Sequence, residues 1–585
     1  MSTAPPRQPL WFEASGLPLL GWYHPPNGAF CRCGVVICNP IGWEAIAAHR
    51  ALRLLAEQLA GVGFAVLRYD HPGQGDSSLC DEDSGLVQAW RAAVVVALDK
   101  LVELSGALEL AVVGVRFGAT LGLYGASDHR KTSSFAALAL CPGNTWGREV
   151  RAFRGLSSVE GSTSSLSEGD EESSGFLFGR ETLAAARELS LRPLPTPVPR
   201  NILLLGREGV AADSALAERL RAAGASVREQ TMPGYTALMQ EPRKSKPPVA
   251  AWDALVAWLS LCHPARPIAA PRTSAVPPQS AQVVPGRGAP PVKETAMSFG
   301  VGGHLFGLLA EPQGAATKSI ALLLTVASHH RVGPNRMHVR WARSLAQRGI
   351  ASFRFDLTGV GDSPTYAGRA ENALYAAEFV ADVQAAMDLL QRERGWDEFA
   401  AVGLCSGAHL AFHATNRDPR ISSQLLINPQ TLYYREGDTT EVTRRQTLRS
   451  NDFYKHAMLS PRTWLRILRG EIQVGPIGRA LLGRLSRKAV LSLNAGVTFL
   501  RSGRAETEVG RDLRLASARG VRTLAIFCSG DEGLDYLAAH LGRNALRAGR
   551  VPGLTTRLVD GPDHTFTQLW AQRWLSDQVL EFLGG

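Results

Sequence analysis

The sequence lacks the features that assign many proteins to a class at first sight. Its N-terminus has no apolar stretch typical of a signal peptide, and no apolar run approaches the ~18 residues needed to span a bilayer. No Cys-x-x-Cys pair is present, and we interpret the lone Cys31-x-Cys33 spacing as structural rather than metal-binding. We therefore expect a soluble protein of the reducing cytoplasm, without a metal or an organic cofactor. The cysteines are Cys31, Cys33, Cys38, Cys80, Cys141, Cys262, Cys405 and Cys528.

A clustered basic–aromatic pattern is missing as well, which argues against a nucleic-acid partner. The net charge of +10 comes mostly from dispersed arginines, so it permits an anionic partner without naming one. What the chain does have is length, with 585 residues of which 45% are hydrophobic and 20% charged. These values are typical of a soluble globular protein with two or more domains.

One turn motif occurs twice. The pattern Asp-x-x-Gly-x-Gly-Asp-Ser spans residues 70–77 and again 356–363, 286 positions apart, and an Arg-aromatic pair precedes each copy. Further on, each half contains a strand ending in a glycine-framed turn, at 114–118 and at 403–407. We interpret this as a tandem domain duplication. Asp356 and Asp362 are expected to hold their turn through side-chain hydrogen bonds to the backbone.

The repeat predicts a domain organisation. We expect a first domain over residues 1–262, a proline-rich, semi-extended linker over 263–296, and a second domain over 297–585. The Ser/Glu/Gly-rich stretch at 157–175 is expected to be a disordered surface loop. A long insertion at about 430–520 predicts a helical cap with a basic face. That cap is either a solvated lid, a guide for an anionic substrate such as a carrier-borne acyl group, or a membrane-surface contact.

Alternating apolar strands and amphipathic helices predict an α/β fold with a mainly parallel, doubly wound sheet in each half. Ligands of such sheets bind beyond the carboxyl ends of the strands. The first-half strands are expected near residues 34–38, 65–69, 110–113, 136–140 and 201–205. The second-half strands are expected near residues 320–324, 351–355, 399–402, 423–427 and 522–527.

The second glycine-framed turn carries a nucleophile. Residues 403–407 read Gly-Leu-Cys-Ser-Gly, which is the G-x-S-x-G nucleophile elbow with Cys405 in the serine position. A strand before it and a helix after it supply the context that the motif requires. The glycines suit a strained turn in which two backbone segments approach closely. Cys405 is therefore the candidate nucleophile.

A cysteine nucleophile needs a base, and the base needs an orienting acid. The chain order in this type of site is nucleophile, acid, histidine. Asp531 follows the strand at 522–527 and is our choice of acid, with Glu532 and Asp535 close enough to compete. His564 lies in a Gly-Pro-Asp-His loop before the last helix and is the predicted base.

The predicted oxyanion hole combines two backbone N–H groups. One belongs to Ser406, directly after the nucleophile, and the other to the loop after residue 324, near Ala327 or Ser328. Three further histidines are nearby in sequence, and for each we expect a packing or surface role. They are His329, His330 and His409.

The first half has lost this chemistry. Its turn at 114–118 places Arg116 where the nucleophile would stand, and a guanidinium is not a nucleophile. The segment that corresponds to the histidine loop, 230–239, has no histidine, while an acid remains at Glu208. The first half is either a decayed copy kept for stability or docking, or a binding module in which Arg116 holds a carboxylate or phosphate.

On these motifs both halves resemble the α/β-hydrolase superfamily. The second half looks like the serine-aminopeptidase-like hydrolases of bacterial biosynthetic gene clusters, through its Arg-Val-Gly-Pro-Asn-Arg segment at 331–336, the elbow and His564. Its cysteine elbow is also similar to that of dienelactone hydrolases. The first half looks like hydrolase-like proteins associated with exosortase and exopolysaccharide gene clusters, through residues 39–44, Arg116 and Met-Pro-Gly-Tyr235. The family's serine is absent from both elbows.

We therefore expect an acyl-transfer enzyme with one working site, in the second half. Cys405 would attack an ester, thioester or lactone of a small-molecule or carrier-borne acyl substrate, as in an esterase or thioesterase. Its thioester intermediate could pass to water or, in an acyltransferase, to another acceptor. The rival hypothesis is a non-catalytic binding or scaffold protein. The sequence does not specify the substrate or the oligomeric state.

Overall fold

The computed structural model describes residues 7–28, 30–157, 166–267, 278–314, 318–434, 507–541 and 552–584. Most of the cap predicted over 430–520 lies outside these residues. The chain divides into two compact units. Unit 1 comprises Met1–Thr317, Ser328–Ala373 and Thr567–Gly585, and unit 2 comprises Lys318–Ala327 and Leu374–Phe566. The units therefore do not follow the predicted domain boundary at 263–296, because unit 1 includes parts of the predicted second domain.

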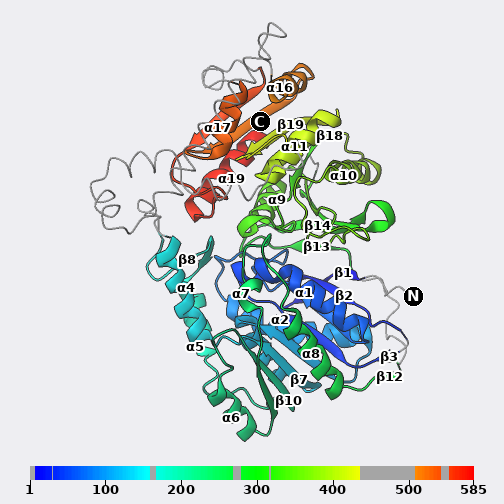
Figure 1. The fold of residues 1–585 in the computed structure, drawn as a ribbon, viewed down its shortest axis with the longest axis vertical. Helices are drawn as coiled ribbons and strands as arrows, with labels where there is room; N and C mark the ends of the chain where they lie inside the picture. Colours follow the sequence, from blue (N-terminus) through cyan, green and yellow to red (C-terminus); the bar gives the residue numbers. More distant parts are fainter. Residues whose placement is uncertain are drawn as a thin grey trace, which may run out of the picture. The chain divides into compact units, whose positions relative to one another are not determined.

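The first half folds around an eight-stranded sheet in unit 1 (Figure 1). β1 and β2 pair antiparallel, β2 pairs antiparallel with β5, and the remaining pairs are parallel. Its central strands are continuous apolar runs, as expected for strands buried on both faces. In sheet order the strands are β1 (Gln8–Ala14), β2 (Leu17–His24), β5 (Ala65–Tyr69), β4 (Gly34–Cys38), β6 (Leu110–Val115), β7 (Thr132–Leu138), β10 (Asn201–Gly206) and β11 (Ser226–Thr231).

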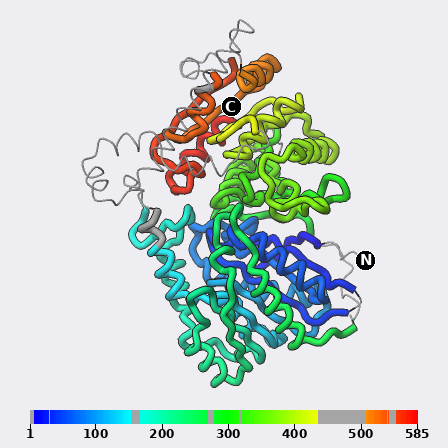
Figure 2. The backbone as a smooth tube through the Cα atoms, viewed as in Figure 1, coloured from blue at the N-terminus to red at the C-terminus, as the bar shows by residue number. Residues whose placement is uncertain are grey.

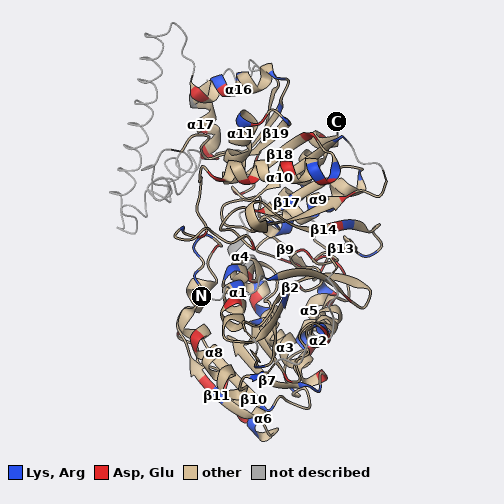
Figure 3. Ribbon diagram, turned by 90° about the vertical axis from the view of Figure 1, so that its right-hand side faces the viewer, with Lys and Arg blue, Asp and Glu red and all other residues tan. Residues whose placement is uncertain are grey.

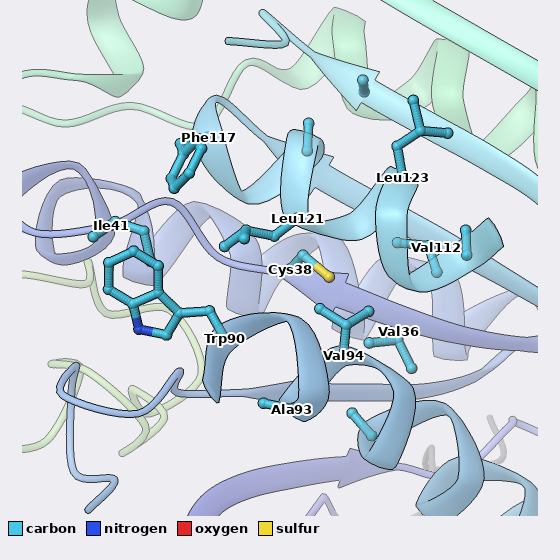
Figure 4. Packing of buried hydrophobic residues seen from close by; sticks show 14 of the residues in the cluster. Val36, Cys38, Ile41, Trp90, Ala93, Val94, Val112, Phe117, Leu121 and Leu123 are labelled. Atoms are coloured by element: carbon cyan, nitrogen blue, oxygen red, sulfur yellow. The ribbon is translucent and has the colours of Figure 1, made fainter. Parts of the chain in front are cut away.

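Helices cover both faces of this sheet. On one face α2 (Leu86–Ser105) and α3 (Phe117–Asp128) pack on alternate strand residues such as Val36 and Val112. Figure 4 shows this core, with the fully buried Trp90 of α2 beside Phe117. On the other face α1 (Trp43–Gly61) and α8 (Val249–Cys262) pack on the intervening residues, such as Val35. The period-two alternation of side chains thus fills two separate cores.

The second sheet has nine strands, and its strand order repeats that of the first. When β13 is left aside and the strands of each sheet are numbered along the chain, both orders are 1-2-4-3-5-6-7-8. The tube in Figure 2 traces the chain through these strands. The prediction of two mainly parallel α/β sheets is confirmed. In sheet order the strands are β13 (Ser280–Val283), β14 (Val292–Phe299), β15 (Leu305–Glu311), β17 (Ser352–Asp356), β16 (Ser319–Leu324), β18 (Glu398–Leu404), β19 (Ile421–Ile427), β20 (Arg522–Cys528) and β21 (Leu554–Val559).

Unit 2 contains the parallel strands β16, β18, β19, β20 and β21. The helices α10 (Phe379–Arg394), α11 (Ser406–Arg417), α16 (Glu508–Ala518) and α17 (Glu532–Leu541) belong to the same unit. Acidic and basic residues alternate on α16, as the red and blue segments of Figure 3 show. This surface helix is therefore of mixed charge.

Two segments predicted to be irregular contain strands. Within residues 263–296, β12 (Arg266–Pro267) pairs with β3 (Phe30–Cys31), and β13 pairs antiparallel with β14. The prolines at 285, 290 and 291 lie in the turn between β13 and β14, where no ladder N–H is needed. Within 157–175, β8 (Glu171–Ser173) forms a hairpin with β9 (Phe176–Phe178), while residues 158–165 lie outside the described residues.

The repeated turn is built in the same way in both halves. The N–H of Asp76 donates to the Asp70 carboxylate at 3.0 Å, and the N–H of Asp362 donates to the Asp356 carboxylate at 2.9 Å. A Cβ on Gly361, whose φ is +57°, would lie within 2.6 Å of the Asp356 carboxylate atoms. The expected side-chain hydrogen bond to the turn backbone is confirmed for Asp356, whereas the Asp362 carboxylate accepts from the Arg68 and Arg331 side chains instead. Glycine is required at position 361 because the Asp356 carboxylate fills the space beside it.

Unit 1 also contains two buried ion pairs in which the arginine of each repeated motif contacts an aspartate of the other. Arg354 donates to Asp76 at 3.1 Å, and the repeat counterpart of Arg354, Arg68, donates to the counterpart of Asp76, Asp362. Arg331 lies between them, 2.8 Å from each of the two carboxylates. All five side chains are at most 6% exposed, so each charge depends on its partners for the solvation that water would otherwise provide.

Candidate active site

Cys405 occupies a strained position between β18 and α11 in unit 2. Its φ of 55° and ψ of −113° lie outside the regions that most side chains adopt. A Cβ on Gly403 would lie 2.1 Å from the backbone of Gly407, and a Cβ on Gly407 would lie 2.9 Å from the Leu324 carbonyl oxygen. The flanking glycines therefore allow the close approach that forces Cys405 into this conformation. The residue is partly exposed, and it precedes the N-terminus of α11, where the helix dipole favours negative charge.

The structure brings the predicted acid and base together. The Nδ1 atom of His564 lies 2.6 Å from an Asp531 carboxylate oxygen. The other Asp531 oxygen accepts the Gly533 N–H at 2.9 Å, which fixes the carboxylate at the end of β20. Glu532 and Asp535, the competing candidates, lie in α17. Among the three acids, Asp531 is therefore the one placed to orient the imidazole.

The charge state of His564 reflects these neighbours. Burial acts to lower its pKa, but the negative charge of a Cys405 thiolate and the hydrogen bond to Asp531 outweigh burial and raise the pKa to about 10. The ring nitrogen Nε2 is buried and has no hydrogen bond of ordinary geometry to any described residue. The raised pKa favours the protonated imidazolium, which Asp531 holds and the Cys405 side chain influences.

The residues predicted to form the oxyanion hole also meet. The N–H of Ala327, which follows β16, donates to the Ser406 hydroxyl at 2.6 Å. Ala327 has a positive φ of 50°, which turns the chain at this point. The hydroxyl thus occupies one of the two N–H groups that we predicted for an oxyanion.

Sequence reasoning missed Asn428 and Cys528. Asn428 follows β19, and its amide donates to the His564 carbonyl at 2.7 Å and to the Cys528 sulfur at 3.2 Å. Its amide oxygen accepts the Cys528 N–H at 2.9 Å. An Asn-Pro pair after a strand was the available signal, but nothing in the sequence tells which loop such an amide would reach.

The neighbouring histidines of α11 have packing roles. The Nδ1 atom of His409 lies 3.2 Å from the Thr431 carbonyl, and its ring lies 4.7 Å from that of Tyr375. Burial, helped by the nearby His413, lowers the pKa of His409 to about 4, so the ring is neutral. The expectation of a packing role for His409 is confirmed. In unit 1, His330 is buried and stacks on His49 at 3.8 Å.

The first-half elbow has the same backbone but different partners. Arg116, with φ 58° and ψ −126°, donates to Glu44 at 2.9 Å and also to Glu149. Burial acts to lower the pKa of its guanidinium, but the Glu44 carboxylate and other nearby groups raise it above its usual range. Glu208 accepts backbone N–H groups of the 234–236 segment. The guanidinium that we considered as an anion site is therefore already paired with two carboxylates.

Among the described residues, no group of histidine, cysteine and carboxylate side chains is arranged to hold a metal ion, and no helix is both long and apolar enough to cross a membrane.

Residues 326–467 match the family model described as serine aminopeptidase, S33. The match includes Ala327 and the Cys405 elbow and ends before Asp531 and His564. A search of curated proteins finds no match. Solved structures that resemble the chain include Est1E from Butyrivibrio proteoclasticus with bound ferulic acid, at 13% identity over 43% of this chain and 97% of that one, with a TM-score of 0.33.

An esterase of Pyrococcus furiosus aligns at 14% identity over 50% of this chain and 89% of that one, with a TM-score of 0.30. The esterase domain of a Rhodothermus marinus protein aligns at 16% identity over 44% and 99%, also with a TM-score of 0.30. Because these TM-scores are below 0.5, the likenesses do not establish an activity. The segment around the elbow is similar to the serine aminopeptidase family, with a cysteine where that family's name leads one to expect a serine.

Proposed function

We propose that the second half is an acyl-transfer hydrolase in which Cys405 is the nucleophile, His564 the general base and acid, and Asp531 the orienting carboxylate. The observation that carries the proposal is the 2.6 Å contact between His564 and Asp531, together with the rise of the His564 pKa to about 10 that the Cys405 charge helps to cause. A cysteine, an imidazole and a carboxylate that meet at three strand ends fit nucleophilic catalysis.

The geometry supports the following sequence of steps. The Cys405 thiolate attacks the carbonyl carbon of an ester, thioester or lactone, and a tetrahedral oxyanion forms. The N–H groups of Ser406 and Ala327 would bind this oxyanion, which replaces the Ser406 hydroxyl as the acceptor for Ala327. The leaving group takes a proton from the His564 imidazolium, and the acyl group remains on Cys405 as a thioester. His564 then removes a proton from water, which attacks the thioester and releases the acid.

Hydrolysis and transfer differ only in the final acceptor. An alcohol or amine in place of water would make the protein an acyltransferase, and the acyl group could arrive on a small molecule or on a carrier. A binding or scaffold protein is the alternative from another class. For that alternative the contact between His564 and Asp531 would be a structural ion pair without turnover.

For the first half we propose a non-catalytic role. The shared strand order, the shared turn and the matching elbow conformations support an origin by duplication, and Arg116 in place of a nucleophile supports a non-catalytic role. We also propose that the first half is related to the hydrolase-like proteins associated with exosortase gene clusters.

The experiment is intact-protein mass spectrometry after incubation with p-nitrophenyl acetate and with an acyl thioester. We expect a single acyl adduct on the peptide that contains Cys405, and its loss in Cys405→Ala. His564→Gln should slow both acylation and release. Arg116→Met serves as the matched control from the other elbow and should retain the adduct. If the wild-type protein gains no adduct on Cys405 and releases no p-nitrophenol, the scaffold alternative holds.

A further inference from the structure

We propose that Asn428 is a positioning residue for the His564 imidazole and acts through the backbone of the loop that carries it. The inference rests on the proposed function and deepens it. Asn428 is fully buried at the carboxyl end of β19, and its side chain contacts a loop that comes 136 positions later in the chain. An unpaired amide group is costly in the protein interior, so the loss of these hydrogen-bond partners would destabilise the folded state.

The amide of Asn428 joins the end of β20 to the histidine loop. Its NH₂ group donates to the His564 carbonyl at 2.7 Å, and its oxygen accepts the Cys528 N–H at 2.9 Å. The Cys528 thiol in turn donates to the Asp563 carbonyl at 3.3 Å. Burial raises the pKa of Cys528 to about 12, so this thiol keeps the proton that it donates. Two successive carbonyls of the histidine loop, those of Asp563 and His564, thus accept hydrogen bonds from side chains at the ends of β19 and β20.

The first half separates the backbone role of this position from its side-chain role. Ala139 follows β7 as Asn428 follows β19, and their φ values are 50° and 43°. The N–H of each donates to the next strand at 2.8 Å, from Ala139 to Leu205 and from Asn428 to Ile526. Alanine therefore meets the backbone requirement in the first half, whose corresponding loop, residues 230–239, has no histidine. The asparagine side chain adds only the connection to Cys528 and His564, in the half whose loop has one.

Such a connection matters because the imidazole works between two partners. His564 must stay within hydrogen-bond distance of Asp531 on one side and remain close to Cys405 on the other. Its loop follows β21 and contains Gly561 at φ +99°. A displacement of about 1 Å in a catalytic group can reduce the rate about 100-fold. The amide of Asn428 supplies a restraint at the histidine residue itself.

The test compares Asn428→Ala and Asn428→Gly with Gln424→Ala in the full-length protein. Gln424 is the matched control, because it is also a buried amide that joins β19 to β20, through the Thr523 hydroxyl at 3.1 Å, but within the described part of the chain it makes no hydrogen bond to the histidine loop. Glycine removes the same amide as alanine without placing a Cβ at a positive φ, so at least one variant should fold. Folding is checked by circular dichroism and thermal unfolding.

The readout is the NMR titration of the His564 ring, assigned by its loss in His564→Gln, together with the rate of Cys405 alkylation by iodoacetamide. Neither measurement requires turnover, so both apply even if the proposed acyl transfer fails in the wild-type protein. We expect the two Asn428 variants to titrate lower by on the order of one pH unit and to react about 10- to 100-fold more slowly, with Gln424→Ala unchanged.

Two results would overturn the inference. One is a folded Asn428 variant with the wild-type titration and alkylation rate. The other is a Gln424→Ala variant that changes both quantities as much, since the effect would then come from loosening of the two strands. Where turnover is found, kcat should fall in the Asn428 variants while KM stays within about twofold, as expected when only the base is displaced.

Discussion

Arg116 and Cys405 share one backbone conformation, with φ and ψ of 58° and −126° in the first half and 55° and −113° in the second. The two halves therefore retain the same strained turn while presenting different chemical groups. In the second half the strain presents a thiol beside an imidazole. In the first half it presents a guanidinium to the carboxylates of Glu44 and Glu149.

The Asp531→Asn variant tests the origin of the His564 charge. The pKa of His564, about 10, lies above the ordinary value of 6.5, so the imidazolium persists until the pH approaches 10. Its contribution to stability is fully present below about pH 6.5 and is lost as the pH rises through about 10. An amide stabilises an imidazolium less than a carboxylate does, so Asp531→Asn should lower the pKa of His564. We therefore expect the change in the rate of Cys405 alkylation by iodoacetamide that accompanies loss of the imidazolium at alkaline pH to occur at a lower pH. A change that stays at the wild-type pH would show that Asp531 does not set the charge.

The elbow glycine should tolerate no side chain. In Gly403→Ala the new Cβ would lie 2.1 Å from the Gly407 backbone, so a strand or a helix must move. We expect a loss of about 1–3 kcal/mol of stability, typical of overpacking in a core, together with a loss of Cys405 reactivity. Denaturant unfolding checks the first expectation and iodoacetamide labelling the second. Gly61→Ala, near the end of α1 with no atom within 4 Å of the new Cβ, should be neutral or stabilising.

The Asp76→Asn variant should be costly although it lies outside the proposed active site. It removes the charge that Arg331 and Arg354 both contact within unit 1. Breaking a buried ion pair typically costs about 3–5 kcal/mol, because the remaining charges stay buried without compensation. Denaturant unfolding should show this loss. Asp128→Asn, in an exposed pair with Arg91, is the control and should change stability by less than about 1 kcal/mol.

The Arg116→Met variant should separate folding from chemistry. Removal of the guanidinium leaves Glu44 and Glu149 without their shared partner at the first elbow. We expect reduced stability and unchanged acylation of Cys405, measured by thermal unfolding and by mass spectrometry. A large fall in acylation with unchanged stability would contradict the non-catalytic role of the first half.

The strands and the elbow were predictable because each depends on residues that are close in sequence. Apolar runs such as residues 34–38 and 522–527 form buried strands, and the elbow needs only its two glycines, a strand and a helix. The meeting of Asp531 and His564 followed from chain order, since parallel strands bring their carboxyl ends to one edge. Asp531 was our choice from the sequence, but only coordinates separate it from Glu532 and Asp535, because one residue of difference moves a side chain from the loop into α17.

Other features depend on contacts between distant segments, which a single sequence does not encode in any local pattern. The residues around Asn428 do not predict its hydrogen bond to the His564 carbonyl, and those around Arg68 do not predict its contact with Asp362. The sequence did not indicate β13 and β14 for a related reason. Proline density excluded regular structure at individual residues, but the strands lie on either side of the prolines.

The reciprocal contacts of Arg68 with Asp362 and of Arg354 with Asp76 limit which substitutions can be tolerated during evolution. A substitution in one repeated turn leaves a charged side chain of the other half without its partner. The residues tolerated in each turn therefore depend on a residue nearly three hundred positions away. Related chains should accordingly covary at these four positions. If the gene were divided between the two halves, each product would contain charged side chains without the partners that the other half supplies. Although we propose a nucleophile in only one half, each half supplies partners for buried charges of the other.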